Sequence, residues 1–165
     1  MISPTGGGIR NDDGGSGYWL APRGLKLHQG VDYELPHGPG QLVVSPITGR
    51  IMRVAYPYSD TQEYSGCEIR GADIWIKMFY LRLYDTIIGC EVSMGQPIGV
   101  AQDISKRYKN VTPHIHLEII KINPELLRKL LTKGSIYEII GTNKKIGEIN
   151  GLFIIPFRSR NQRTC

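Results

Sequence analysis

The chain has no apolar run long enough to span a membrane, and its 165 residues include only three cysteines and four histidines. The cysteines, Cys67, Cys90 and Cys165, form neither a CxxC pair nor an even disulfide set, so we expect buried, reduced thiols. No phosphate-binding glycine loop, nucleophile elbow or dinucleotide fingerprint is present. These absences exclude a membrane-spanning protein and a disulfide scaffold, and argue against the common nucleotide-binding enzymes.

The net charge of +5 suits acidic partners such as cell-wall polymers, nucleic acid or anionic lipid. The basic residues gather mainly from Lys121 onward, and aromatic residues do not alternate with them. We therefore interpret this basic region as a solvated or docking surface and expect no nucleic-acid partner. Residues 1–15 hold no apolar stretch or cleavage site, which predicts no signal peptide. We expect synthesis in the cytoplasm and action outside the cell or as part of a virion.

Twenty glycines and ten prolines are spread along the chain and predict many short elements joined by tight turns. Apolar runs separated by turn signals indicate strands, and in the run 74–83 the piece 74–80 is the most strand-like, since it is β-branched and aromatic. This pattern predicts a mainly β fold, an antiparallel sandwich or barrel-like domain with one short C-terminal helix. The other expected strand regions are 42–44, 50–55, 67–70, 87–88, 98–101, 136–140 and 152–157.

The expected helix follows Asn123, which can cap it, and begins with Pro124 at the first helical position. Leucines recur at helical spacing over 126–131, and Gly134 is the expected stop. We divide the chain into an extended N-terminal arm over 1–24, a central domain over 25–124 and a C-terminal helix with an apolar, basic tail over 125–165. The two arms are expected to bind other proteins of a larger assembly.

Three of the four histidines lie in two compact motifs, His28-Gln29-Gly30-Val31-Asp32 and His114-Ile115-His116. Imidazoles with a carboxylate are a common zinc ligand set, and a catalytic zinc keeps one position open. In an extended strand His28 and Asp32 would lie ~13 Å apart, so they can share an ion only across a bend or on a helix. Gly30 favours the bend.

His114 and His116 are two residues apart, and on a strand they would face the same side at ~6–7 Å. One of them can bind the metal while the other lies within reach of an activated water and moves protons. The alternative is that both histidine motifs occur by chance and bind no metal, in a β-sandwich protein with a structural role.

The motifs resemble those of the lysostaphin/LytM-type zinc metallopeptidases, in the subgroup that includes the leukocyte-derived chemotaxin and phage and bacterial relatives. The similarity covers roughly residues 10–125 and keeps several motifs in order. Besides the two histidine motifs, these are Gly15–Gly17, Ala21–Gly24, Val44–Ile51, Tyr56–Tyr58, Lys77–Tyr80, Gly95–Gly99 and Thr112–Glu118.

This resemblance implies Zn²⁺ as cofactor, with His28, Asp32 and His116 as its ligands and His114 as a catalytic histidine. It also implies an antiparallel β domain with a central groove, acting as a metalloendopeptidase on the peptide crosslinks of peptidoglycan. A phage tail or a cell-wall-acting bacterial protein is the expected setting. Glu118 could orient a ligand imidazole or be a plain exposed glutamate.

The chain departs from the family pattern at Arg82, because active members usually have a second catalytic histidine there, in a tyrosine-x-histidine-leucine segment. Arginine cannot act as a base at neutral pH, although it can hold an anion or a carbonyl oxygen. The alternative function is therefore a catalytically inactive, zinc-stabilised binding or structural module. His37 is a minor candidate for the missing histidine, and Tyr80 could donate a hydrogen bond to a substrate. The segment 103–108 is interpreted as a surface loop.

Overall fold

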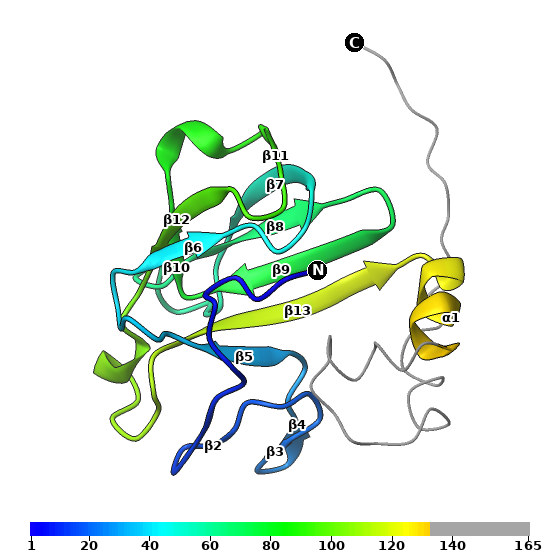
Figure 1. Cartoon of the computed structure of the whole chain (residues 1–165). Coiled ribbons are helices and arrows are strands. Elements are labelled where there is room, and N and C mark those ends of the chain that lie inside the picture. The colour runs from blue at the N-terminus through cyan, green and yellow to red at the C-terminus, as the bar shows by residue number, and fades with distance from the viewer. Residues whose placement is uncertain (133–165) are drawn as a thin grey trace.

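The structure is a computed structural model that describes residues 1–132, and two antiparallel sheets dominate it (Figure 1). The three-stranded sheet consists, in spatial order, of β10 (Leu81–Leu83), β12 (Pro97–Ala101) and β6 (Leu42–Val44). The six-stranded sheet runs through β11 (Glu91–Val92), β7 (Gly49–Ala55), β8 (Gly66–Arg70), β9 (Ile74–Phe79), β13 (His114–Ile122) and β5 (Val31–Glu34). Within the described range neither sheet closes into a barrel, and the predicted mainly β, antiparallel fold with one helix is confirmed.

The buried side chains of both sheets form one hydrophobic cluster. Side chains alternate along each strand, so one face of the six-stranded sheet supplies Ile69, Ile76 and Ile115 to this core. Val43 and Ile98 enter it from the three-stranded sheet and are fully buried. Because this face is occupied by the core, the opposite face of β9 and β13 is available to present polar groups.

Most of the expected strands are present, with two differences. The run 74–83 does not continue as one strand, because it breaks at Tyr80 between β9 and β10 and changes sheets there. Ile87, expected in a strand, ends a 3₁₀ turn, η1 (Asp85–Ile87), and a second such turn is η2 (Ile104–Lys106). The expectation of buried thiols holds for Cys67, whereas the thiol of Cys90 is exposed.

The helix α1 (Pro124–Thr132) begins where the sequence predicts it. The side-chain oxygen of Asn123 accepts a hydrogen bond from the backbone N–H of Glu125 at 2.9 Å, which is the expected cap. Leu127 and Leu130 pack against the hydrophobic core. Gly134, the expected strands over 136–140 and 152–157, and Cys165 lie outside the described residues.

Residues 1–27 contribute short paired strands beside β5: β1 (Asn11–Asp12) with β2 (Gly15–Ser16), and β3 (Pro22–Arg23) with β4 (Lys26–Leu27) (Figure 1). This segment hydrogen-bonds to both backbone groups of Asp32 in β5. The Asp32 carbonyl oxygen accepts from the N–H of Arg10, and the Asp32 N–H donates to the carbonyl oxygen of Gly17. The proposed division into arm, domain and tail stays a prediction. In the part of the chain that the structure covers, no helix is long and apolar enough to cross a membrane.

Candidate metal centre

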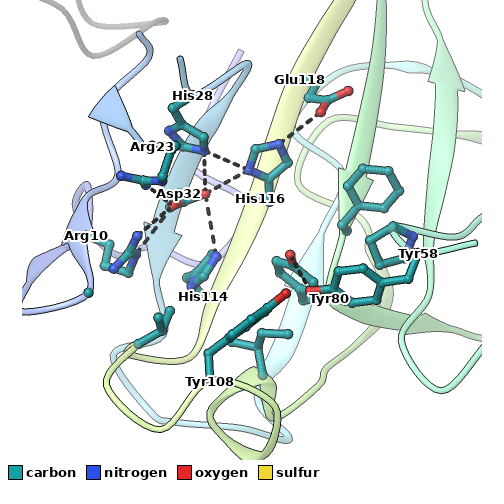
Figure 2. A pocket seen from close by; sticks show the side chains of 15 residues that line it. Arg10, Arg23, His28, Asp32, Tyr58, Tyr80, Tyr108, His114, His116 and Glu118 are labelled. Carbon is teal, nitrogen blue, oxygen red and sulfur yellow. Dashed lines mark hydrogen bonds and ion pairs between the residues drawn. The ribbon is translucent and has the colours of Figure 1, made fainter. Parts of the chain in front are cut away.

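A cavity of about 410 Å³ opens on the face of the six-stranded sheet that points away from the core (Figure 2). Its volume lies within the usual range for small-molecule and peptide side-chain sites. Strands β5, β9 and β13 supply one side, and the loops around Tyr58 and Tyr108 supply the other. The lining includes Arg10, Arg23, His28, Asp32, Pro57, Tyr58, Phe79, Tyr80, Ile104, Tyr108, Val111, His114, His116 and Glu118.

His28, Asp32 and His116 meet at one point of this cavity, and their nearest ligand atoms could hold a metal ion. His116 Nδ1 lies 2.8 Å from Asp32 Oδ1 and 3.0 Å from His28 Nε2. His28 Nε2 lies 3.1 Å from Asp32 Oδ1. The structure therefore brings together all three residues that the sequence nominates, while their role as ligands stays a prediction.

The outer nitrogen of each imidazole is held by an oxygen that can only accept. His28 Nδ1 donates to the carbonyl oxygen of Tyr18 at 2.9 Å, and His116 Nε2 donates to Glu118 Oε1 at 3.1 Å. The inner nitrogens, His28 Nε2 and His116 Nδ1, point at the shared centre, and in the neutral ring these nitrogens carry the lone pair that a metal ion needs. Glu118 therefore orients the His116 imidazole and is not a plain exposed glutamate.

The carboxylate of Asp32 divides its two oxygens between different partners. Oδ2 accepts from Arg10 Nη2 at 3.0 Å and from Arg23 Nη2 at 3.3 Å, whereas Oδ1 faces the histidines. Arg10 is almost fully buried and also binds Asp12, so its position is set from both sides. The arginines fix the rotation of the carboxylate and leave Oδ1 directed at the shared centre.

The cluster carries a permanent negative charge at Asp32. Burial alone would raise the pKa of Asp32, but hydrogen bonds from His116 and His28 hold that pKa well below its ordinary value. Burial alone would lower the pKa of His116, but its hydrogen bonds to Asp32 and Glu118 raise it to about 9. Burial lowers the pKa of His114. In the ion-free protein a proton on His116 thus stands where a cation would bind.

Two glycines allow the cluster to pack so closely. The chain bends at Gly30, as expected, but the reason is space, because its φ is not positive and a Cβ there would lie 2.7 Å from the His116 ring and 2.4 Å from the Leu117 carbonyl oxygen. A Cβ at Gly17 would lie 2.8 Å from that of Asp32. The strand pairing completes the arrangement, since His116 is directly opposite Asp32 in the β13–β5 register.

His114 shares the face of β13 with His116, as the two-residue spacing predicts, and it lines the same cavity. Its Nδ1 donates to the carbonyl oxygen of Thr112 at 2.7 Å, so Nε2 carries the lone pair. That nitrogen lies 3.5 Å from Asp32 Oδ1. His114 is therefore adjacent to the ligand group but is outside the set of atoms that could bind the ion together.

Three tyrosines form the side of the cavity opposite the imidazoles, and we call Tyr58, Tyr80 and Tyr108 the phenol wall (Figure 2). The hydroxyl oxygens of Tyr58 and Tyr80 are 3.1 Å apart, and the Tyr80 ring meets the His114 ring edge-on at 5.1 Å. Sequence reasoning considered Tyr80 alone and treated 103–108 as plain surface. The shared place of Tyr58 and Tyr108 in this cavity was missed, because no short motif connects residues so far apart in the chain.

Comparison with known proteins identifies the family. No protein-family model matches the chain. Leukocyte cell-derived chemotaxin-2 of Bos taurus is 36% identical over 112 residues, which make up 67% of this chain and 72% of the chemotaxin. The chain belongs to the lysostaphin/LytM-type metallopeptidase family. The resemblance stated from the motifs is thereby confirmed.

Solved structures of peptidases are also similar to this member of the lysostaphin/LytM family. The catalytic domain of the antimicrobial peptidase lysostaphin from Staphylococcus simulans is 23% identical with a TM-score of 0.47, over 66% of this chain and 79% of that one. A peptidase from Pseudomonas aeruginosa is 16% identical with a TM-score of 0.45, over 72% of this chain and 44% of that one. Family membership rests on the chemotaxin.

Arg82, which takes the position of the family's second catalytic histidine, has an exposed side chain on β10 and does not line the cavity. His37, the minor candidate to replace that histidine, lies in an exposed turn where its N–H donates to Gln41 Oε1. It does not line the cavity either. Among residues 1–132 the imidazoles of this cavity are therefore those of His28, His114 and His116.

Proposed function

We propose that this chain is a zinc-dependent peptidase domain that hydrolyses peptide crosslinks of peptidoglycan. One observation carries the proposal: His28 Nε2, Asp32 Oδ1 and His116 Nδ1 converge, and the opposite atom of each group is held by a separate partner. A cluster with only a structural role would not need both imidazoles turned with their inner nitrogens toward one carboxylate oxygen.

The spacing of the donors supports zinc. Tetrahedral zinc bonds of about 2.0–2.1 Å to nitrogen and oxygen place any two ligand atoms about 3.3 Å apart. The three donor separations here are 2.8, 3.0 and 3.1 Å, so each side chain needs to move outward by only a few tenths of an ångström, on the order of thermal motion. Two nitrogens and one carboxylate also leave a fourth position open to the cavity.

The chemistry of the site would be amide hydrolysis. A bound zinc ion would supply Lewis-acid chemistry for a carbonyl and a water. His114 Nε2 lies beside the ligand group with its lone pair free, so it can take a proton from the water as the water oxygen adds to the carbonyl carbon. When the C–N bond breaks, the same nitrogen returns that proton to the departing amine. The products are a carboxylic acid and an amine.

Peptidoglycan is proposed as the substrate because it is the substrate that the resemblance to the lysostaphin/LytM-type metallopeptidases implies. The net charge of +5 favours binding to an anionic cell wall. The shallow, strand-lined cavity also suits an extended peptide more than a compact metabolite.

The direct test is digestion of purified peptidoglycan by the zinc-loaded full chain, followed by quantification of new amino groups. We expect release that stops with a chelator and returns when zinc is restored. His114→Ala should keep its zinc and lose at least 10²-fold in rate, the usual contribution of a general base. No release by the zinc-loaded protein from walls of several crosslink types would reject hydrolysis.

A second candidate function is a zinc-stabilised module that binds the wall without cutting it. The absence of a second catalytic imidazole from the described cavity favours it. The same preparation separates the two functions, because a binding module would sediment with peptidoglycan and release no amino groups.

A further inference from the structure

We infer that Tyr80, supported by Tyr58, donates a hydrogen bond to the substrate carbonyl oxygen and takes over part of the work of the missing second histidine. This inference rests on the proposed function and assigns a residue to it. The hydroxyl groups of the phenol wall face the histidines across the cavity (Figure 2).

The phenol wall has more hydroxyl protons than hydrogen bonds that use them. Tyr58 and Tyr80 have two hydroxyl protons but make one hydrogen bond with each other, at 3.1 Å. Tyr108 accepts from Arg107 Nε at 3.5 Å and adds a third hydroxyl, while its contact with Tyr58 uses one further proton. Within residues 1–132 these three hydroxyls make no further hydrogen bond to another residue. At least one O–H is therefore available to a ligand in the cavity.

The backbone at Tyr80 is held in a conformation that costs free energy. Its φ is +69°, and within the described range Leu20 is the other non-glycine residue with a positive φ. As a result Phe79 and Tyr80, although consecutive, both line the cavity. The N–H of Tyr80 donates to the Ser65 carbonyl oxygen at 2.8 Å, and its carbonyl oxygen accepts from Gln102 at 2.8 Å.

The same backbone geometry accounts for the different places of Tyr80 and Arg82. The left-handed residue ends β9 and starts β10 in the other sheet, so Tyr80 faces the histidines while Arg82 is exposed. The left-handed conformation of Tyr80 costs about 1–3 kcal/mol. In a regular strand the Tyr80 phenol would point in another direction. Strained residues of this kind concentrate at functional sites.

Tyr58 is a positioning residue and is itself fixed. The guanidinium carbon of Arg107 lies 4.0 Å from the centre of the Tyr58 ring, and Arg107 Nη2 lies 3.3 Å from Asp60 Oδ2. Because the Tyr58 hydroxyl is held next to that of Tyr80, it can accept or donate as charge develops on a ligand. A neutral phenol directed at a developing oxyanion is a recognised means of stabilising acyl-transfer transition states.

The experiment measures binding of a phosphinic peptide to the zinc-loaded full chain by calorimetry. This probe replaces the scissile amide with a tetrahedral phosphinate that mimics the oxyanion, and the matching amide peptide serves as the ground-state reference. Tyr80→Phe removes the hydroxyl and keeps the ring. We expect it to weaken phosphinate binding by about 10²-fold, amide binding by less than about 3-fold, and zinc affinity not at all. Tyr58→Phe should weaken phosphinate binding by about 5-fold.

Tyr64→Phe is the matched control, because Tyr64 packs against the same rings but its hydroxyl donates to the Asp103 carbonyl oxygen and does not line the cavity. It should bind the phosphinate like wild type. Equal phosphinate binding by wild type and Tyr80→Phe overturns the inference, as does a wild type that binds no phosphinate. An equal loss for both peptides would show a structural role and also overturns it. The proposed function is decided separately, by amino-group release from peptidoglycan.

Discussion

The two sides of the cavity are built in opposite ways. On the imidazole side, consisting of His28, Asp32, His114 and His116, acceptor lone pairs converge and attract a cation. On the phenol wall, at least one hydroxyl proton makes no hydrogen bond within the wall and is available to an acceptor. The first side is fixed by strand register and by partners behind each group, and the second by loops and a left-handed residue. A polarised carbonyl, whose oxygen accepts and whose carbon is attacked, fits between them.

The largest expected effect is that of Asp32→Asn on the imidazole side. It should abolish measurable zinc binding and lower the free energy of unfolding by about 3–5 kcal/mol, because it removes the charge that Arg10 and Arg23 bind in a buried setting. Calorimetric zinc titration and urea unfolding measure the two effects. Asp13→Asn, at an exposed neighbouring carboxylate, is the control and should change neither. If Asp32→Asn still bound zinc, Asp32 would not be a ligand, and the contrast between the imidazole side and the phenol wall would fail.

Gly30→Ala should be next, with a loss of about 1–3 kcal/mol in stability and a clear loss of zinc affinity. The added Cβ would push against the His116 ring and the Leu117 carbonyl oxygen. Gly8→Ala is the matched control, because a Cβ there meets no atom within 4 Å and its φ is not positive. Equal zinc affinity in both variants would show that close packing at Gly30 does not position His116.

Glu118→Gln should weaken zinc binding by about 10–100-fold without unfolding the protein, because the carboxylate behind a metal-binding imidazole orients it and raises its basicity. Competition with a chromogenic chelator gives the affinity. Glu91→Gln is the control, since that carboxylate makes only an exposed ion pair with Arg50. If Glu118→Gln binds zinc like wild type, the orientation of His116 is set by packing alone.

A smaller effect is expected from Asp12. Its carboxylate joins the N-terminal segment to the residues before β13, because it accepts hydrogen bonds from Arg10 and from the N–H of Thr112. Burial opposes ionisation, but hydrogen bonds from Thr112 and Arg10 lower the pKa of Asp12 from 3.8 to about 2. A lowered pKa stabilises the fold above pH 3.8, and this contribution is lost as the pH falls through about 2. Melting temperatures between pH 6 and 2 should therefore fall less steeply in Asp12→Asn than in wild type. Parallel curves would contradict the assignment.

The smallest effect is expected for Arg82→His. Its side chain is exposed and does not line the cavity, so wall hydrolysis and phosphinate binding should stay within about 2-fold of wild type, as for most surface substitutions. A large gain in hydrolysis would show that position 82 reaches the reacting atoms. The donor role would then belong there rather than to Tyr80.

The sequence predicts the imidazole side well because its residues lie in short motifs. The spacing of His114 and His116 puts both on one face of a strand, and the bend at Gly30 brings His28 to Asp32. Arg10 could not be found in this way, because its ion pair with Asp32 connects positions 22 residues apart and depends on how the N-terminal segment folds back.

The phenol wall illustrates the limit of pattern reasoning. The run 74–83 has strong β character throughout, and nothing in its composition shows the left-handed conformation at Tyr80 that divides it. That conformation is held by two residues that are remote in sequence, since the Tyr80 N–H donates to the Ser65 carbonyl oxygen and the Tyr80 carbonyl oxygen accepts from the Gln102 N–H. The helix is the opposite case, since its cap at Asn123 is a local signal and forms as predicted.

Anomalous diffraction at the zinc edge, from crystals of the full chain grown with one equivalent of zinc, tests the central claim most directly. The account predicts one peak per chain at about 2.0–2.2 Å from His28 Nε2, Asp32 Oδ1 and His116 Nδ1, with His114 and the phenol wall at longer distances. A peak bound through His114, or no peak in this cavity, would contradict it.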